Sequence, residues 1–434
     1  MSNGNNLDAP GPLRVMISAG EASGEMYGAE LLAALRELHG ETAGAQSGNA
    51  ALPAAGASAG NAALPAAGAQ AIECFGMGGE RMSQAGCELV VHARDVAVVG
   101  LFEVLSHLPR IYREFHKLLA EIDRRPPDVA VLIDFPDWNF RLAKQLHRRG
   151  IPVVYYVSPQ LWAWRKGRLK LVQRYVSEML VIIPFEREFY AQNGVQVEFV
   201  GHPLSELEPP KVSREEFARR WELDAARSWI ALLPGSRRKE LRLNLPAMLE
   251  AAERLGSGFE YVMPVASTLD KDWVREQIAM CARKVEIQLT DDARASLLHA
   301  RVGVVASGTA TVEAALIGTP FVMVYRVAGL TWMLGRHLVK LPYYGMVNLV
   351  AGREVVPELI QDGFTPESVV REVKALLEDG EARQRMKEAL AEVRGMLRGE
   401  LTADSTPGGS GESAAYRAAR AVLRVAESAE RERE

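Results

Sequence analysis

Residues 302–320 read VGVVASGTATVEAALIGTP, an apolar run followed by a glycine turn and a helical pattern. The β-branched run 302–306 predicts a buried strand, and 310–317 predicts a helix that begins directly after the turn. A strand that passes through a glycine turn into a helix is the repeating unit of an α/β fold.

The turn of this stretch is a candidate phosphate site. The amides of Ser307, Gly308 and Thr309 lie where the predicted helix starts, and unpaired N–H groups there favour a diphosphate. Glu313 follows one turn later on the same face, where its carboxylate could accept hydrogen bonds from a ribose diol. Taken alone, the stretch is better explained by a simpler interpretation, a capped turn followed by a solvated glutamate.

The same unit recurs along the whole chain. Short apolar runs separated by helical stretches indicate parallel sheets covered on both faces. We therefore predict an α/β fold of two similar-sized, doubly wound, Rossmann-like domains facing a central cleft. The predicted strands are 13–17, 71–75, 129–133, 153–157, 179–183 and 197–200, then 229–233, 261–264, 286–289, 302–306 and 321–325.

Changes in composition predict the domain boundaries. The string GNAALPAAGA occurs at 48–57 and again at 60–69, and such a segment cannot bury enough surface to fold alone. A proline-rich break near residue 204 separates the two series of strands. The predicted order is a disordered leader 1–12, a first domain 13–205 with a flexible insertion 40–70, a linker 206–212, a second domain 213–400, a flexible stretch 401–412, and a final helix 413–434 that packs back on the first domain.

Length, charge and cysteine content exclude several classes of protein. The chain has 434 residues, with 51 Lys and Arg against 55 Asp and Glu, and this near balance argues against a nucleic-acid binder. The three cysteines lack C-x-x-C spacing, which disfavours a disulfide scaffold or a zinc-cysteine site. No apolar run approaches the roughly 18 residues that span a bilayer. We expect a cytoplasmic protein that does not cross the membrane.

A second candidate phosphate contact lies in the stretch 232–240, LLPGSRRKE. Its Pro-Gly-Ser turn ends a predicted strand, so Ser236 and Arg237 are expected at the cleft, where a guanidinium suits a phosphate or a leaving diphosphate. An exposed basic turn with no ligand is the alternative.

Carboxylates at two strand ends are candidates for acid–base chemistry. Asp134 ends the apolar strand 129–133, at the sheet edge where open α/β folds bind ligands, and could act as a general base toward a sugar hydroxyl. Asp137 is interpreted as a helix N-cap. The first strand ends in SAGEASGEMYG at 18–28, whose glycine spacing is neither a dinucleotide fingerprint nor a Walker loop. Within it Glu21, Ser23 and Gly24 are expected to meet a polar substrate.

The helix predicted at 101–122 has two interpretations. Its apolar residues span about 140° of the helix surface, more than the roughly 100° that an ordinary surface helix buries. A buried helix is the simpler explanation, and the alternative is that its first half enters a bilayer surface. A basic stretch at 165–174 lies near a Trp pair and could also face anionic lipid. The candidate membrane contacts are Leu101, Phe102, Val104, Leu105 and Leu108.

Together these motifs resemble one family. The strings GEASG at 20–24, YVSP at 156–159 with WAWR at 162–165, LPGSR at 233–237, SGT at 307–309 and NLVAGRE at 348–354 are similar to those of the lipid-A-disaccharide synthases. The resemblance runs from about residue 13 to the C-terminal helix. Glu25 departs from it, because many relatives have Asp there.

The resemblance implies an inverting glycosyltransferase with a GT-B fold that uses neither cofactor nor metal. Its substrates would be UDP-2,3-diacylglucosamine and 2,3-diacylglucosamine 1-phosphate, at the inner face of the cytoplasmic membrane. By similarity Asp134 is the base, and Arg237 lies near the leaving diphosphate. Glu313 binds the uridine ribose, and Asn348 is a polar residue at the donor site.

Two other functions remain open from the sequence. One is a different GT-B activity, such as N-acetylglucosaminyl transfer to a lipid-linked muropeptide or UDP-sugar epimerisation. The other is a non-enzymatic UDP-sugar-binding membrane adaptor. The Trp-Ala-Trp segment at 162–164 disfavours the first, and the joint presence of Asp134, Arg237 and Glu313 disfavours the second.

Overall fold

The computed structural model describes residues 12–46, 72–96, 101–163, 166–329, 332–333, 341–400 and 412–433. The chain forms two compact units, which are described separately: unit 1 comprises residues 1–203 and 408–434, and unit 2 comprises residues 204–407. Nearly all of the predicted leader, most of the predicted insertion, and all but the last residue of the stretch 401–412 predicted to be flexible lie outside the described residues.

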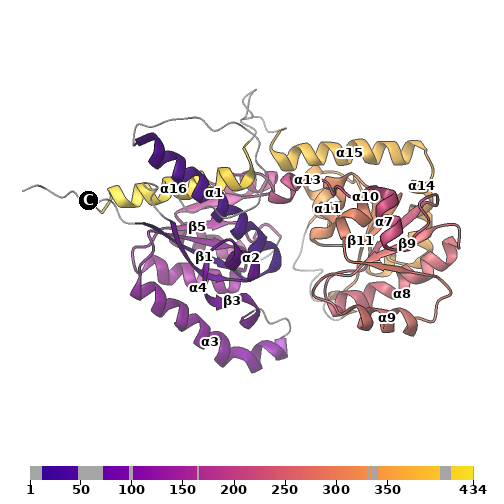
Figure 1. The fold of residues 1–434 in the computed structure, drawn as a ribbon, viewed down its shortest axis with the longest axis horizontal. Coiled ribbons are helices and arrows are strands. Elements are labelled where there is room, and N and C mark those ends of the chain that lie inside the picture. The colour runs from indigo at the N-terminus through magenta and orange to yellow at the C-terminus, as the bar shows by residue number, and fades with distance from the viewer. Residues whose placement is uncertain are drawn as a thin grey trace, which may run out of the picture. The chain divides into compact units, whose positions relative to one another are not determined.

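Unit 1 is built on a seven-stranded parallel sheet with the order β3-β2-β1-β4-β5-β6-β7 (Figure 1). β1 pairs with β2 on one side and with β4 on the other, so the order of strands reverses between β1 and β4. Ligands of open α/β sheets bind at the carboxyl ends of the strands beside such a reversal. The strands are β1 (Leu13–Ala19), β2 (Ile72–Gly78), β3 (Glu88–His92), β4 (Val129–Ile133), β5 (Val153–Tyr156), β6 (Glu178–Val181) and β7 (Glu198–Phe199).

Helices connect and cover these strands. They are α1 (Ala22–Gln46), α2 (Glu80–Gln84), α3 (Leu101–Arg124), α4 (Pro136–His147), α5 (Leu169–Tyr175), α6 (Pro184–Gln192) and α16 (Ala414–Arg431). Because α1 continues to Gln46, the first residues of the segment predicted to be flexible are helical. The sequence ETAGAQ at 41–46 contains Ala, Glu and Gln, which are good helix formers.

Unit 2 repeats the architecture with a six-stranded parallel sheet of order β10-β9-β8-β11-β12-β13. Here the order reverses between β8 and β11, which pair directly. The strands are β8 (Trp229–Leu233), β9 (Glu260–Pro264), β10 (Gln288–Thr290), β11 (Val302–Ala306), β12 (Phe321–Tyr325) and β13 (Glu358–Ile360). The helices are α7 (Arg214–Arg220), α8 (Arg238–Leu255), α9 (Lys271–Met280), α10 (Ala293–His299), α11 (Thr309–Ile317), α13 (Met346–Ala351), α14 (Pro366–Leu377) and α15 (Glu381–Arg398).

The prediction of two doubly wound α/β domains is confirmed, with two strands missed. β3 and β13 are edge strands of five and three residues. β13 is too short to show an alternating pattern, and the sequence ELVVH of β3 follows directly on a short helix and turn. The strand predicted at 286–289 lies at 288–290.

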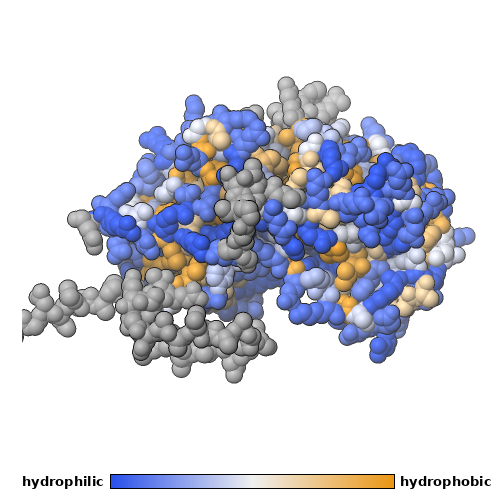
Figure 2. All heavy atoms as spheres, turned by 90° about the horizontal axis from the view of Figure 1, so that it is seen from above, coloured by the Kyte–Doolittle hydropathy of each residue, from blue (hydrophilic) through white to orange (hydrophobic). Residues whose placement is uncertain are grey.

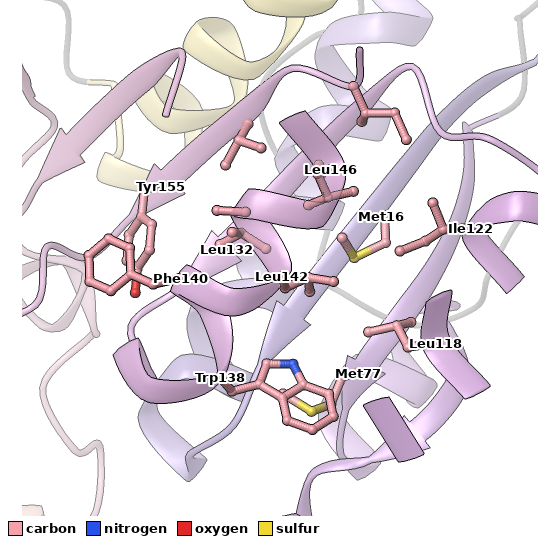
Figure 3. Close-up of a cluster of buried hydrophobic side chains, with 14 of the residues drawn as sticks. Met16, Met77, Leu118, Ile122, Leu132, Trp138, Phe140, Leu142, Leu146 and Tyr155 are labelled. Carbon is pink, nitrogen blue, oxygen red and sulfur yellow. The ribbon is translucent and has the colours of Figure 1, made fainter. Parts of the chain in front are cut away.

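The core of unit 1 buries only part of the apolar stripe on α3. Leu118, Leu119 and Ile122 are buried with β-strand residues such as Met16 (Figure 3). Toward the start of the helix, Leu108 and Tyr112 are 45% and 66% exposed. In the described part of the stripe the C-terminal end is therefore core, whereas Leu108 and Tyr112 are exposed, so the helix is not buried along its whole length.

Helix α16 brings the end of the chain back to unit 1, where it contacts α1, β4, β5 and β6 (Figure 1). Arg417 Nε donates to the Val200 carbonyl at 2.8 Å, and an Arg424 Nη atom lies 2.6 Å from a Glu198 carboxylate oxygen. Small side chains let the helix approach closely, and the buried ones are Ala414, Ala415, Ala418, Ala419, Ala421, Val422 and Ala426.

This packing predicts that Val422→Asp destabilises unit 1. Val422 is fully buried, and an unpaired carboxylate there should lower the free energy of unfolding by more than about 3 kcal/mol. Urea unfolding measures the loss, and amide exchange in α1 should accelerate while exchange in α8 does not change. The matched control is Glu427→Asp, on the exposed face of the same helix, which should be neutral. Equal effects of the two substitutions would contradict the packing.

Candidate active site

The first cluster of predicted site residues lies where β1 and β4 end in unit 1. Ala19 is the register partner of Ile133, so the turn after β1 lies beside the turn after β4. A side chain at Gly20 would place its Cβ 2.3 Å from the Phe135 ring. The two turns can be this close only because residue 20 is glycine.

Asp134 has a constrained backbone. Asp134 and Phe135 both have left-handed conformations, with φ of 43° and 47°. A residue other than glycine costs about 1 kcal/mol or more in this conformation, and such backbone strain concentrates at functional sites. The strained pair turns the chain directly from β4 into α4, so Asp134 stands at the carboxyl end of its strand as predicted.

The Asp134 carboxyl has an unusual electrostatic environment. Burial, and to a lesser extent the nearby charge of Glu21, raise its pKa to about 7, against one backbone hydrogen bond from Phe135 that lowers it. A carboxylate with a pKa near neutrality is a much stronger base than an ordinary aspartate and is still deprotonated at slightly alkaline pH.

The other predicted residues of this cluster differ in their exposure. Glu21 is exposed, Ser23 is half-buried, and Gly24 is buried against the Ile133 side chain, where an added Cβ would lie 3.3 Å from it. Gly24 thus lets α1 pack on β4. The Glu25 carboxylate accepts a hydrogen bond of 2.6 Å from the Arg81 amide near the start of α2.

The N-cap interpretation of Asp137 is wrong. α4 begins at Pro136 with Phe135 as its N-cap residue, so Asp137 lies in the first helical turn. Its carboxylate forms an ion pair with Arg168. The strained turn supplies the start of the helix without a side-chain cap, which the sequence pattern did not reveal.

The turn after β8 forms the second cluster, in unit 2. Ser236 and Arg237 are exposed at the start of α8. Glu240 organises this turn: its carboxylate accepts a 3.2 Å hydrogen bond from the Ser236 amide and pairs with Arg237 at 3.2 Å. Gly235, at φ 122°, has no room for a Cβ, which would lie 2.7 Å from Glu240 Cβ. Thr268 donates to the Ser236 carbonyl at 2.6 Å.

The turn after β11 lies beside this one, because Leu233 is the register partner of Val305. Gly308 and Thr309 are exposed at the N-terminus of α11. Gly308 is the N-cap residue, and no side chain caps the helix there. Burial raises the pKa of Glu313, partly offset by the nearby Arg294. Ser307 is half-buried, and its amide donates to the Val324 carbonyl at 2.8 Å.

Asn348 lies in a different setting from the other predicted residues. It is fully buried, and its Nδ2 donates to the Val356 carbonyl at 2.9 Å and to Glu358 at 2.8 Å. Its Oδ1 accepts from the amides of Val355 and Val356 at 2.7 and 3.0 Å. The carboxamide therefore holds the loop before β13 in place, and its contact with a donor stays a prediction.

Three residues that support these turns and loops from neighbouring elements were not predicted from the sequence: Glu358 in β13, Asn139 in α4 and Tyr155 in β5. Glu358 accepts hydrogen bonds of 2.8 Å from the amides of Tyr344 and Gly345. Asn139 lies on the buried face of α4, and a polar residue in an otherwise apolar stripe was the signal for it. Tyr155 carried no signal, since an aromatic residue is ordinary in a buried strand.

Each unit therefore has turns at the carboxyl end of its sheet. In unit 1 these turns carry a carboxylate on a strained backbone, and in unit 2 they carry a helix N-terminus and an exposed arginine. Among the described residues, no group of three or more His, Cys, Asp or Glu side chains lies close enough to hold a metal ion. The two Rossmann-like units, each built on a doubly wound parallel sheet, define the GT-B fold class. The similar solved structures agree. A putative UDP-N-acetylglucosamine 2-epimerase from Listeria monocytogenes has a TM-score of 0.57 at 15% identity, with 97% of each chain covered. MurG from Acinetobacter baumannii has a TM-score of 0.51 at 14% identity, with 95% of this chain and all of that one covered.

Sequence comparison identifies the family. The family model for lipid-A-disaccharide synthetase matches residues 15–401. The lipid-A-disaccharide synthase of Koribacter versatilis is 55% identical over 415 residues, which cover 96% of this chain and 99% of that protein. The lipid-A-disaccharide synthase of Acidobacterium capsulatum is 49% identical over 408 residues, which cover 91% of this chain and 93% of that protein. The chain belongs to the lipid-A-disaccharide synthase family of UDP-sugar glycosyltransferases.

The contact between Gly20 and Phe135 predicts that Gly20→Ala displaces Phe135 and with it the strained turn at Asp134. Glycosyl transfer should fall by about 100-fold, because small displacements of a reacting group are costly. UDP release measures the rate. Replacing Phe135 by Ala in the same chain removes the clash and should restore part of the stability.

Gly40→Ala is the matched control, because a Cβ at Gly40 meets nothing within 4 Å. Gly40 lies within α1, the helix that follows the Gly20 turn, and the substitution should raise stability by up to about 1 kcal/mol. Normal transfer by Gly20→Ala would show that the two turns can separate at no cost to activity.

Proposed function

We propose that this chain joins UDP-2,3-diacylglucosamine to 2,3-diacylglucosamine 1-phosphate, forming the β-1′,6-linked lipid A disaccharide 1-phosphate and UDP. Family membership supports this reaction. The observation that carries the mechanism is Asp134, a half-buried carboxyl with a pKa of about 7 at the end of β4.

In the proposed reaction Asp134 takes the proton from the acceptor hydroxyl. That oxygen forms a bond to the anomeric carbon of the donor from the face opposite the diphosphate. The bond from this carbon to the diphosphate oxygen breaks in the same displacement, and UDP leaves with the electron pair. A single displacement inverts the anomeric configuration and passes through an oxocarbenium-like transition state.

Unit 2 would bind the donor and stabilise the leaving charge. The exposed amides at the start of α11 and the Arg237 guanidinium are suited to a diphosphate. Arg237 pairs with Glu240, so a diphosphate bound to the guanidinium would compete with that carboxylate. Glu313 would bind the ribose diol, and Asn348 would act indirectly by fixing the loop before β13.

Replacing Asp134 by Asn should abolish transfer and leave UDP binding nearly intact, because the proposed UDP contacts are all in unit 2. UDP release and equilibrium UDP binding measure the two properties. Equal loss of both would contradict the base assignment. In wild-type enzyme the rate should rise with pH through about 7, as Asp134 loses its proton.

The same substitution should raise stability at alkaline pH. The folded-state pKa of Asp134 is above its ordinary value, so ionisation favours the unfolded chain, and wild-type stability is lost as pH rises toward 7. Asn has no such ionisation. The thermal midpoint of Asp134→Asn should therefore exceed that of the wild type at pH 8 but not at pH 4.

We further propose that the first half of α3 contacts the inner face of the cytoplasmic membrane, where both lipid substrates would reside. Large exposed apolar side chains are few among the described residues, and two of the four, Leu108 and Tyr112, lie one turn apart on α3. The face shown in Figure 2 is mostly hydrophilic, with several apolar patches between the hydrophilic residues. Of the adjacent cations, Arg110 pairs with Asp95 and Lys117 is exposed.

The side chains of the other four candidate contacts, Leu101, Phe102, Val104 and Leu105, lie outside the described residues. No helix in the described parts of the chain is long and apolar enough to span a bilayer. A peripheral contact through one face of a helix is the kind of association that an amphipathic helix supports.

Replacing Leu108 and Tyr112 together by Ser should weaken binding to anionic liposomes several-fold without lowering the thermal midpoint, because both side chains are exposed. Co-sedimentation with liposomes measures the binding. Met280→Ser is the matched control, since Met280 is 77% exposed in unit 2 and should not affect binding. Replacing Leu101, Phe102 and Leu105 by Ser should have the same effect as the α3 pair. Loss of the thermal transition would instead indicate that the helix belongs to the core.

A further inference from the structure

Two buried polar side chains donate hydrogen bonds to the main chain of Asp134, and a third orients one of them. Ser18, Asn139 and Tyr155 come from β1, α4 and β5, and all three are completely buried. The Tyr155 hydroxyl donates to the Asp134 carbonyl at 2.7 Å. Asn139 Nδ2 donates to the same carbonyl at 2.7 Å and to the Ile133 carbonyl at 3.1 Å.

The Asn139 carboxamide is itself oriented from β1. The Ser18 hydroxyl donates to Asn139 Oδ1 at 2.8 Å, which directs Nδ2 toward the strained turn. On the other side of Asp134, its amide donates to the Tyr156 carbonyl at 3.1 Å. Both peptide groups that flank the Asp134 Cα are therefore tied to β5, and the direction of its Cα–Cβ bond is fixed. Only the two side-chain torsions of the carboxylate remain free.

The fold alone does not require this network. The Tyr155 ring already packs against Phe140 at 5.3 Å between centroids, so a phenylalanine at 155 would fill the same space (Figure 3). Burying hydroxyl and amide groups removes them from water, and such groups are retained only with hydrogen-bond partners. Here the partners include the main-chain carbonyl of Asp134, the first of two consecutive non-glycine residues with left-handed backbone.

We infer that Tyr155 and Asn139 are positioning residues for the reaction, which hold Asp134 in its left-handed turn and so aim its carboxylate at the acceptor hydroxyl. The inference rests on the proposed function of Asp134. Neither residue touches substrate in this scheme, and each acts through the Asp134 peptide.

Tyr155→Phe tests the inference. The Asp134 carbonyl keeps its bond from Asn139, so the chain should fold, but the turn loses one of its supports. We expect kcat to fall by about 10- to 100-fold, since reaction rates are sensitive to the placement of a catalytic group. The KM of both substrates and the affinity for UDP should stay within about twofold of wild type, because ground-state binding is not altered. A less constrained carboxylate gains access to water, so the acidic limb of the pH profile of kcat should move to lower pH.

Tyr261→Phe is the matched control. Tyr261 is also buried, and its hydroxyl donates to two main-chain carbonyls, those of Ala252 and Gly256, both at 2.8 Å. These lie at the end of α8 farthest from Arg237, roughly 25 Å along the helix at about 1.5 Å per residue. Both variants lose one buried hydroxyl, so their thermal midpoints should fall by similar amounts, and only Tyr155→Phe should change kcat and the pH profile.

The outcomes are distinct. If Tyr155→Phe matches Tyr261→Phe in kcat and in pH profile while Asp134→Asn is inactive, the positioning role is wrong and the base assignment stands. If Asp134→Asn still transfers, the base assignment fails and the inference fails with it. Should Tyr155→Phe lose more stability than its control, Ser18→Ala provides the second variant. It frees the Asn139 carboxamide without altering the core aromatic ring, and an unchanged kcat there would likewise overturn the inference.

Discussion

The close pairing of β1 with β4 is the constraint on which the first unit's site depends. These strands are neighbours at the point where the order of the sheet reverses, so the turns that follow them share one small space. Because residue 20 is glycine, the Phe135 ring can lie where a Cβ would otherwise be. The left-handed pair Asp134–Phe135 fits into the remaining space. The position of the carboxylate follows from this sharing of space. In unit 2 the same relation holds between β8 and β11, and there it brings a basic turn beside the start of a helix.

Local sequence patterns predict what is determined locally. The apolar runs locate the central strands, and Asp134, Arg237 and the 307–309 turn follow directly from being at strand ends. The supports of these residues were not predictable, because they are supplied from distant parts of the chain. Tyr155 meets Asp134 across 21 positions, and Asn139 meets Ser18 across 121. No periodicity within a window of ten or twenty residues encodes such contacts.

The apolar stripe of α3 shows a second limit of pattern analysis. Its regular spacing from Leu101 to Ile122 predicts the helix correctly but says nothing of where the sheet beneath it ends. Ile122 is buried and Tyr112 is exposed, although both fit the same stripe. Asn348 illustrates the converse: motif similarity places it at a donor site, whereas its burial and its four hydrogen bonds are properties of the folded loop.

Helix α16 has a consequence for how the protein is made. It forms part of unit 1, yet about 200 residues of unit 2 are synthesised before it. At about 5–20 residues per second, the ribosome needs roughly 10–40 s to produce them. During that time the surface of α1 that α16 will cover has no partner, while unit 2 can already fold as an uninterrupted segment. The first unit to be started is thus the last to be completed, and in that interval its uncovered apolar surface is a natural target for chaperones.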